Sequence, residues 1–148
     1  LELRTAAQPR LRALCYSNFG AQGFSAGSRT TLDAILRAAG LDNVVAQAGL
    51  TGHVNATFEQ LLAFDPDLII VSQPLNAPAG IAGDRGGASE QVLLTEPSLA
   101  GLRAVRERRI VRLPAGLYAT ASHGLVAAAE RLFDEVESLR RRLADGPR

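Results

Sequence analysis

The stretch Asp65-Pro66-Asp67-Leu68-Ile69-Ile70-Val71 carries the clearest signal for the fold class of this chain. Leu68–Val71 is a continuous apolar run without alternating polar residues, which is typical of a strand buried on both faces, as in a parallel sheet. Pro66 stands two residues before this run and ends any helix that precedes it, because proline cannot donate the helical hydrogen bond. The stretch therefore predicts a helix followed by a central strand of a parallel sheet.

The residues near the start of the chain predict a strand, a glycine-rich loop and a helix. Leu11–Ser17 is short and apolar, as expected for a buried strand, and Asn18–Gly27, with three glycines, predicts a loop. Thr30 and Asp33 resemble a capping box, and Gly40 stands where a helix would end in a left-handed residue. We therefore expect a helix between Thr30 and Gly40.

The rest of the chain continues this alternation. Asn43–Ala46 predicts a short strand, and Thr57–Gln60 is a second capping signal, which opens a short helix. The apolar face expected for that helix consists of Phe58, Leu61 and Leu62. Beyond the central strand, we expect an irregular segment, a short helix, a strand and a long amphipathic helix over Gln73–Ser89, Pro97–Leu102, Arg109–Leu113 and Ser122–Leu143.

Strands that alternate with helices indicate right-handed crossovers and a mainly parallel sheet covered by helices on both faces. The expected fold class is therefore α/β, with three layers in the order αβα. The 148 residues correspond to one domain. Leu1–Arg10 is polar and contains a proline, so we interpret it as the remnant of a linker, and 11–148 as the domain itself.

The composition excludes several classes of function. A formal net charge of +1 gives no broad electrostatic field for nucleic acid, and no apolar run approaches the roughly 20 residues of a membrane helix. All 16 basic residues are arginines, so the sequence contains no lysine for a Schiff base or a P-loop. One cysteine and two histidines give no cluster spaced for zinc. We therefore expect no metal site, no cofactor and no nucleic-acid partner.

In an open parallel sheet, ligands bind beyond the carboxyl ends of the strands, which points to the segments after Ser17, Val71 and Leu113. The aromatic residues in and beside these segments can form an apolar lip for a large flat ligand, or they can belong to the core. These residues are Phe19, Phe24 and Tyr118. Arg29 and Arg85 can pair with carboxylates of a ligand, although solvation is the ordinary state of an isolated surface arginine.

Other candidates have simpler interpretations. The glycines of the first loop do not have the GxGxxG spacing of a dinucleotide site, and they can serve only the turn. His123 follows Ser122 without a nucleophile elbow, which argues against a hydrolase. His53 can be a metal or haem ligand, but in a turn it is more simply solvated, and Cys15 within a strand is expected to be buried and unreactive.

Glu59 is the one carboxylate that we single out. It falls in the first turn of a short helix and is expected to point outward, where it can dock onto an arginine of another protein. Alternatively, it only complements the dipole at the amino end of that helix.

The order of these segments resembles the C-terminal lobe of ABC-importer substrate-binding proteins of the cobalamin, ferric-siderophore and haem type. The stretches that carry most of the resemblance are Ala38–Val45 (AAGLDNVV) and Phe58–Val71 (FEQLLAFDPDLIIV). Gly27–Thr30, Glu96–Leu99 and Arg109–Pro114 keep the order of the family. The resemblance covers the chain from about Arg12 onward.

This resemblance implies one Rossmann-like lobe of a two-lobed binding protein, with a metal chelate bound between the lobes and no catalysis. Leu1–Arg10 would be the end of a helix that connects the lobes, and the amino-terminal lobe would be absent from this sequence. The cleft positions would fall within Asn18–Arg29, Gln73–Arg85 and Ala115–His123, and we select Phe19, Phe24, Arg29, Asn76, Arg85 and Tyr118.

The same resemblance implies a partner and a location. In the family, a surface glutamate of each lobe docks onto the dimeric permease of the importer, and the matching position in this chain is Glu59. The location would be periplasmic or extracytoplasmic, with a lipid anchor as one form of the full-length protein.

Two rival interpretations remain open from the sequence. A Rossmann-like nucleotide-binding enzyme domain would show the same alternation of strands and helices and would use the glycine-rich first loop for phosphate. A chelatase-like or nitrogenase-cofactor-like protein would need a cluster-binding cysteine, and Cys15 lies within a predicted strand.

Overall fold

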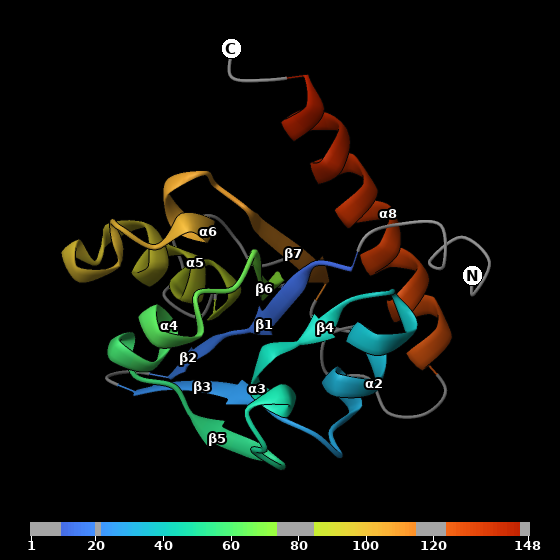
Figure 1. Ribbon diagram of the computed structural model, residues 1–148, viewed down its shortest axis with the longest axis horizontal. Coiled ribbons are helices and arrows are strands. Elements are labelled where there is room, and N and C mark those ends of the chain that lie inside the picture. Colours follow the sequence, from blue (N-terminus) through green and yellow to red (C-terminus); the bar gives the residue numbers. More distant parts are fainter. Residues whose placement is uncertain (1–9, 20–21, 74–84, 115–123, 146–148) are drawn as a thin grey trace.

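The computed structural model describes residues 10–19, 22–73, 85–114 and 124–145 (Figure 1). It has a four-stranded parallel sheet flanked by helices and a smaller three-stranded antiparallel sheet. The predicted α/β class with a mainly parallel sheet is confirmed. The interpretation of Leu1–Arg10 as a linker falls almost entirely outside the described residues and stays a prediction.

The parallel sheet has the order β4-β1-β6-β7. Its strands are β4 (Asp42–Asn43), β1 (Arg12–Cys15), β6 (Leu68–Gln73) and β7 (Ile110–Pro114). The first four residues of β6 are fully or almost fully buried, as expected from their unbroken apolar sequence. β6 pairs with both β1 and β7, so the stretch quoted first forms a central strand.

Two layers of helices cover the two faces of this sheet. One face packs against α2 (Thr31–Ala38) and α8 (Leu125–Ala144) through Cys15, Leu68 and Ile70. The alternate residues Leu14 and Ile69 face the second layer. That layer consists of α3 (Val44–Gln47), α4 (Phe58–Phe64), α5 (Arg85–Thr95), the 3₁₀ helix η1 (Pro97–Leu99) and α6 (Arg103–Arg106). The alternation follows from the two-residue period of a strand.

The first glycine-rich segment is not the loop predicted from the sequence. It forms an antiparallel hairpin of β2 (Ser17–Phe19) and β3 (Gln22–Ala26), and β3 also pairs with β5 (His53–Asn55). At Gly23, a Cβ atom would lie 2.6 Å from the carbonyl oxygen of Ala56 and 2.7 Å from the ring of Tyr16. Glycine is therefore used here for close packing within a strand and not for a flexible turn.

Two further predictions need correction. Asn43–Ala46 is not one strand, because Asn43 ends β4 and caps α3 by accepting a hydrogen bond from the backbone N–H of Val45 at 3.1 Å. The segment predicted to be irregular as far as Ser89 becomes helical at Arg85. In the helix after Thr30, the predicted amino-terminal cap is confirmed in its first half, since Thr30 Oγ1 accepts from the N–H of Asp33, whereas the Asp33 carboxylate binds Asn43 and Arg37. Gly40 has the predicted left-handed conformation, with a φ of 82°.

Candidate functional site

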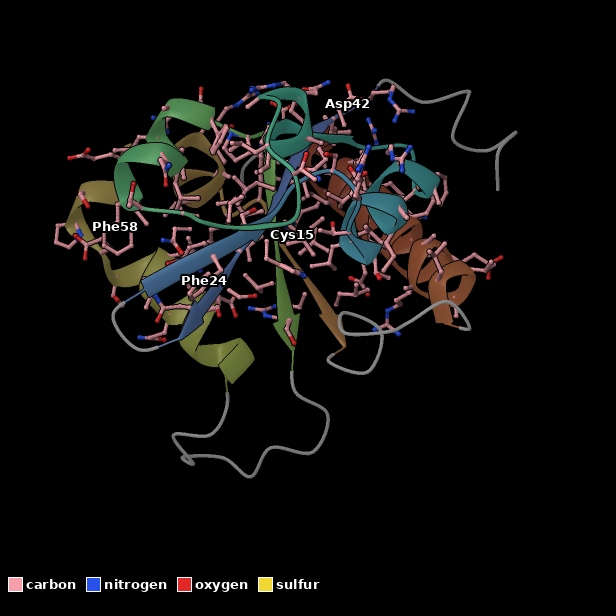
Figure 2. All side chains as sticks on the ribbon, turned by 90° about the horizontal axis from the view of Figure 1, so that it is seen from below. Cys15, Phe24, Asp42 and Phe58 are labelled. Carbon is pink, nitrogen blue, oxygen red and sulfur yellow. The ribbon has the colours of Figure 1, made fainter. Side chains whose placement is uncertain are left out.

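The candidate ligand site lies at the carboxyl ends of β1, β6 and β7. β1 pairs in parallel with β6, and β6 pairs in parallel with β7, so the carboxyl ends of the three strands lie along one edge of the sheet. Figure 2 shows β6 and β7 ending side by side on this edge. In open α/β sheets, ligands bind outside this edge. The β2–β3 hairpin follows β1 directly, whereas 74–84 and 115–123, after β6 and β7, lie outside the described residues.

A polar cluster of Tyr16, Asn18 and Ser89 joins the hairpin to α5 at this edge. The Asn18 side chain donates to Tyr16 Oη at 3.2 Å, and the Asn18 backbone N–H donates to Ser89 Oγ at 3.0 Å. Tyr16 is completely buried, and this burial raises the pKa of its phenol, although the hydrogen bond from Asn18 opposes the shift. The phenol therefore stays protonated at neutral pH and fixes the hairpin instead of titrating.

Phe24, labelled in Figure 2, lies in strand β3 of this hairpin. It lies in β3 opposite Ser17 of β2 and Asn55 of β5, and its side chain is half-buried. The next residue, Ser25, points the other way and donates to the carbonyl oxygen of Cys15 at 2.5 Å. Alternation along the strand thus places Phe24 on the face of the small sheet opposite Ser25.

The structure describes the side chains of only two of the six predicted cleft residues. Arg29 is exposed and has a φ of 62°, in the turn between β3 and α2. Phe19 ends β2 and Arg85 begins α5, but their side-chain positions lie outside the description. The remaining two cleft positions, Asn76 and Tyr118, fall in the segments that are not described. The joint cleft of all six residues stays a prediction.

Glu59 lies in the first turn of α4 and is exposed. A capping box holds this end of the helix, because the N–H of Thr57 donates to Gln60 Oε1 at 2.8 Å and the N–H of Gln60 donates to Thr57 Oγ1 at 3.2 Å. The expected apolar face of α4 needs one correction. Leu61 is fully buried, whereas Leu62 is 40% exposed and points outward on the same side as Glu59.

The other end of α4 is held by Arg12, the first residue of β1. Its guanidinium donates to the carbonyl oxygens of Phe64 and Asp65, both at 2.8 Å. The Arg12 backbone N–H donates to Asp67 Oδ2 at 2.8 Å. Asp65 has a φ of 43°, a left-handed conformation that ends the helix. Helix α4 is thus fixed at its amino end by its own capping box and at its carboxyl end by Arg12 of the parallel sheet.

Cys15 is buried beside an ion-paired carboxylate, as a small apolar residue would be. Burial, and to a smaller extent the negative charge of Asp33, raise the pKa of the Cys15 thiol to about 12. Asp33 itself accepts from the Asn43 side chain at 3.1 Å and pairs with Arg37 at 3.2 Å. The prediction of a buried, unreactive thiol at position 15 agrees with this environment.

Two further candidates from the sequence are the histidines. His53 is exposed in β5, not in the turn expected for it, and His123 lies outside the described residues. No group of three or more His, Cys, Asp or Glu residues suited to a metal ion occurs in the described part of the chain. Within the same ranges, no helix has the length and apolar character needed to cross a membrane.

A separate hollow of about 320 Å³ lies between β7 and α8. Both arginines that line it already have partners. Arg112 forms a bidentate ion pair with Glu90, and Arg142 donates to the carbonyl oxygen of Arg108 at 3.2 Å. The hollow is lined by Ile110–Arg112 and by the second half of α8, which places it away from the carboxyl edge of the sheet.

The sequence and the fold of the chain are similar to those of known proteins. Residues 2–117 match a family model described as periplasmic binding protein. No curated protein matches the chain. Among solved structures, a periplasmic haem-binding protein named BhuT, in complex with two haems, is 28% identical with a TM-score of 0.71. The match covers 91% of this chain and 49% of that one.

Two further structures show the same relationship. A periplasmic haem-binding protein from Pseudomonas aeruginosa is 26% identical with a TM-score of 0.62, and the match covers 90% of this chain and 46% of that one. An ABC-type Fe³⁺-hydroxamate transport protein from Saccharomonospora viridis shares the fold, with 22% identity, a TM-score of 0.69 and coverage of 91% and 46%. The chain therefore spans about half the length of these proteins.

Proposed function

The chain belongs to the periplasmic binding protein family, as its sequence predicted, and we propose that it is one lobe of the substrate-binding component of an ABC importer. The observation that carries this proposal is the family match together with the coverage of about half of each similar structure. A lobe of such a protein supplies one wall of a cleft, and a second, amino-terminal lobe supplies the other. The carboxyl edge of the parallel sheet is the wall that this chain offers.

The proposed ligand is a metal chelate, with haem as the first choice and a ferric siderophore or cobalamin as alternatives. Two structures that are more than 25% identical bind haem according to their names. The described residues suit a flat ligand with carboxylates. The half-buried ring of Phe24 offers a stacking surface, and the exposed guanidinium of Arg29 can pair with a carboxylate.

The proposed role is capture and delivery without chemical change to the cargo. The binding protein would work outside the cytoplasmic membrane, either free or lipid-anchored. It would hand the chelate to a permease dimer, onto which Glu59 docks. Support comes from the exposed position of Glu59 on a helix that is fixed at both ends. A carboxylate presented in this way can form a charge-assisted pair with an arginine of the partner.

The rival interpretation as a nucleotide-binding enzyme loses its geometric basis. A Rossmann-type site needs the first strand to run through a glycine-rich turn into a helix, whose amino end binds phosphate. Here β1 is followed by the β2–β3 hairpin, and Gly23 lies within a paired strand. The first helix, α2, begins only at Thr31, beyond that hairpin.

A titration of the full-length protein tests this function. We expect haem to bind and to shift its Soret absorption, with ferric hydroxamate and cobalamin as the competing chelates. Replacing Phe24 by alanine should weaken chelate binding about tenfold, because a stacked ring contributes on the order of 1 kcal/mol or more. The matched control is Phe64→Ala, since Phe64 is also half-buried but ends α4 beside Arg12, away from the carboxyl edge. Binding of NAD or ATP with no affinity for any chelate would overturn the proposal.

A further inference from the structure

We propose that the groove between β7 and α8 binds a short, extended, acidic segment of a partner protein, which adds as a strand to the free edge of β7. This groove is the hollow of about 320 Å³ that is lined by Ile110–Arg112 and by the second half of α8. The inference is independent of the proposed function, because the groove lies away from the candidate ligand site.

The free edge of β7 carries the first step. β7 is the last strand in the order β4-β1-β6-β7, so it is paired on one side only, with β6. The N–H of Ile69 in β6 donates to the carbonyl oxygen of Arg109 at 3.0 Å. Backbone groups of successive residues in a strand point to opposite sides, so Arg109 and Val111 face β6, whereas Ile110 and Arg112 face away from it. No strand of the described chain takes up the N–H and C=O groups of these two residues.

The second step is the space beside this edge. Helix α8 runs next to β7 (Figure 1), and its groove-lining residues are spaced three or four positions apart, on one face of the helix. Two of the lining side chains, Val111 and Leu139, are buried and form an apolar floor. Ser138 is small and exposed, and leaves the groove open. An unpaired edge with room beside it is the arrangement in which extended peptides bind by strand addition.

The charges at the groove select an acidic segment. Both carboxylates at the groove are already neutralised, because Glu90 pairs with Arg112 and Glu135 pairs with Arg131 at 3.1 Å. Arg142 donates to a backbone carbonyl oxygen and has no carboxylate partner among the residues that the structure describes. A guanidinium has five N–H groups, so most of those of Arg142 remain for a ligand. A carboxylate of the added segment can therefore form a charge-assisted pair with Arg142.

The edge itself favours a peptide over a simple anion. Ile110 and Arg112 each offer one donor and one acceptor, and a phosphate or sulfate has no N–H group for the acceptors. An extended backbone offers both kinds of group at the spacing of the strand. The contact is short, because Pro114 has no N–H and Arg142 already binds the carbonyl oxygen of Arg108.

The test titrates the full-length, ¹⁵N-labelled protein with a blocked hexapeptide of alternating valine and glutamate, and follows amide hydrogen exchange by NMR. We expect the peptide to slow exchange of the Ile110 and Arg112 N–H groups at least about tenfold. The Val111 N–H faces β6 and should not change. The same peptide with lysine in place of glutamate should not bind.

Two methylated peptides test strand addition itself. One carries N-methyl groups at the valines and the other at the glutamates. Only one of the two should lose binding, because an added strand directs alternate N–H groups toward the edge.

Matched variants test the role of Arg142. Arg142→Glu should weaken peptide binding about tenfold or more, since it removes a charged hydrogen bond. The control is Arg141→Glu, which makes the same change of charge at the next exposed position of α8, outside the groove. In 0.15 M salt, charges act over about 8 Å, so the control should stay within about twofold of the wild type. Ser138→Phe should block the groove without loss of a core contact, because Ser138 is exposed.

Each other outcome would contradict the inference. Equal losses in Arg142→Glu and Arg141→Glu would indicate general charge attraction in place of a groove. Equal binding of both methylated peptides would exclude strand addition. If no peptide binds and phosphatidylglycerol vesicles bind the wild type but not Arg142→Glu, the surface binds anionic lipid instead and the peptide inference is wrong. Haem titrations of Arg142→Glu and Ser138→Phe should match the wild type, and absence of haem binding in all of them would count against the proposed function alone.

Discussion

Replacing Gly23 by alanine should destabilise the chain strongly, although glycine was expected there only for a loop. The new Cβ would lie 2.6 Å from the carbonyl oxygen of Ala56 and 2.7 Å from the ring and hydroxyl of Tyr16. Neither neighbour can move freely. The Ala56 N–H is bonded to the carbonyl oxygen of Gly23 at 2.8 Å, and Tyr16 is completely buried. Overpacking of this kind costs about 1–3 kcal/mol, and two immobile neighbours place Gly23→Ala at the upper end, about 3 kcal/mol.

Urea unfolding of the 148-residue chain, followed by far-UV circular dichroism, measures this effect. The midpoint should fall while the slope of free energy against urea stays the same, because the surface exposed on unfolding is unchanged. The melting temperature should drop by about 6–12 °C, at about 2–4 °C per kcal/mol for a chain of this size. The matched control is Gly101→Ala, where a Cβ would meet nothing within 4 Å and which should be neutral or slightly stabilising. Equal stability of the two variants would show that residue 23 is not packed in a strand and would refute the reasoning.

Three further predictions concern Arg12, the Cys15 thiol and Glu59. Arg12→Ala should lower the free energy of unfolding by about 1–2 kcal/mol, because the carbonyl oxygens of Phe64 and Asp65 lose charged donors, and an unchanged urea midpoint would contradict it. The Cys15 pKa of about 12 lies above its ordinary value of 9.0, so this group stabilises the fold fully below pH 9.0 and loses that contribution as pH rises towards 12. Stability should therefore fall more steeply above pH 9.0 in the wild type than in Cys15→Ala, and rapid reaction of the native thiol with a disulfide reagent at pH 8 would argue against burial. Glu59→Ala should abolish uptake by cells at unchanged chelate affinity of the purified protein, and normal uptake would remove Glu59 from the docking surface.

The elements that could be predicted from the sequence are those with local causes. The strand at Leu68–Val71 follows from its unbroken apolar run, and the helix after Thr30 follows from a cap and a glycine that both lie within ten residues of it. The sequence does not show whether Asn43 lies within a strand or caps a helix. Asparagine at the junction of a strand and a helix acts as a cap, but the apolar residues that follow it also suit a strand.

The hairpin and the polar cluster depend on contacts that no local pattern reveals. Glycine in a strand and glycine in a loop look alike in sequence, and the close approach of Ala56 to Gly23 decides between them. Asn18 and Ser89 are 71 positions apart, and they meet only because α5 returns from the carboxyl edge of β6 to the hairpin. In α4, Leu61 and Leu62 are adjacent, so helical periodicity over seven residues could not decide which of them is buried.

Arg10 and Arg12 hold the beginning of the described chain to the parallel sheet and to α4. Arg10 pairs with Asp42 at 2.6 Å and donates to the carbonyl oxygen of Leu41 at 2.9 Å, while Arg12 holds the end of α4. The first described residues of the chain thus bind the edge of the sheet and the end of α4. β1 then leads directly to the candidate ligand site, and α4 packs on the same sheet through Leu61. Under the proposed function, a movement that turns the candidate ligand site would therefore also turn Glu59, because both lie on elements packed on the same parallel sheet.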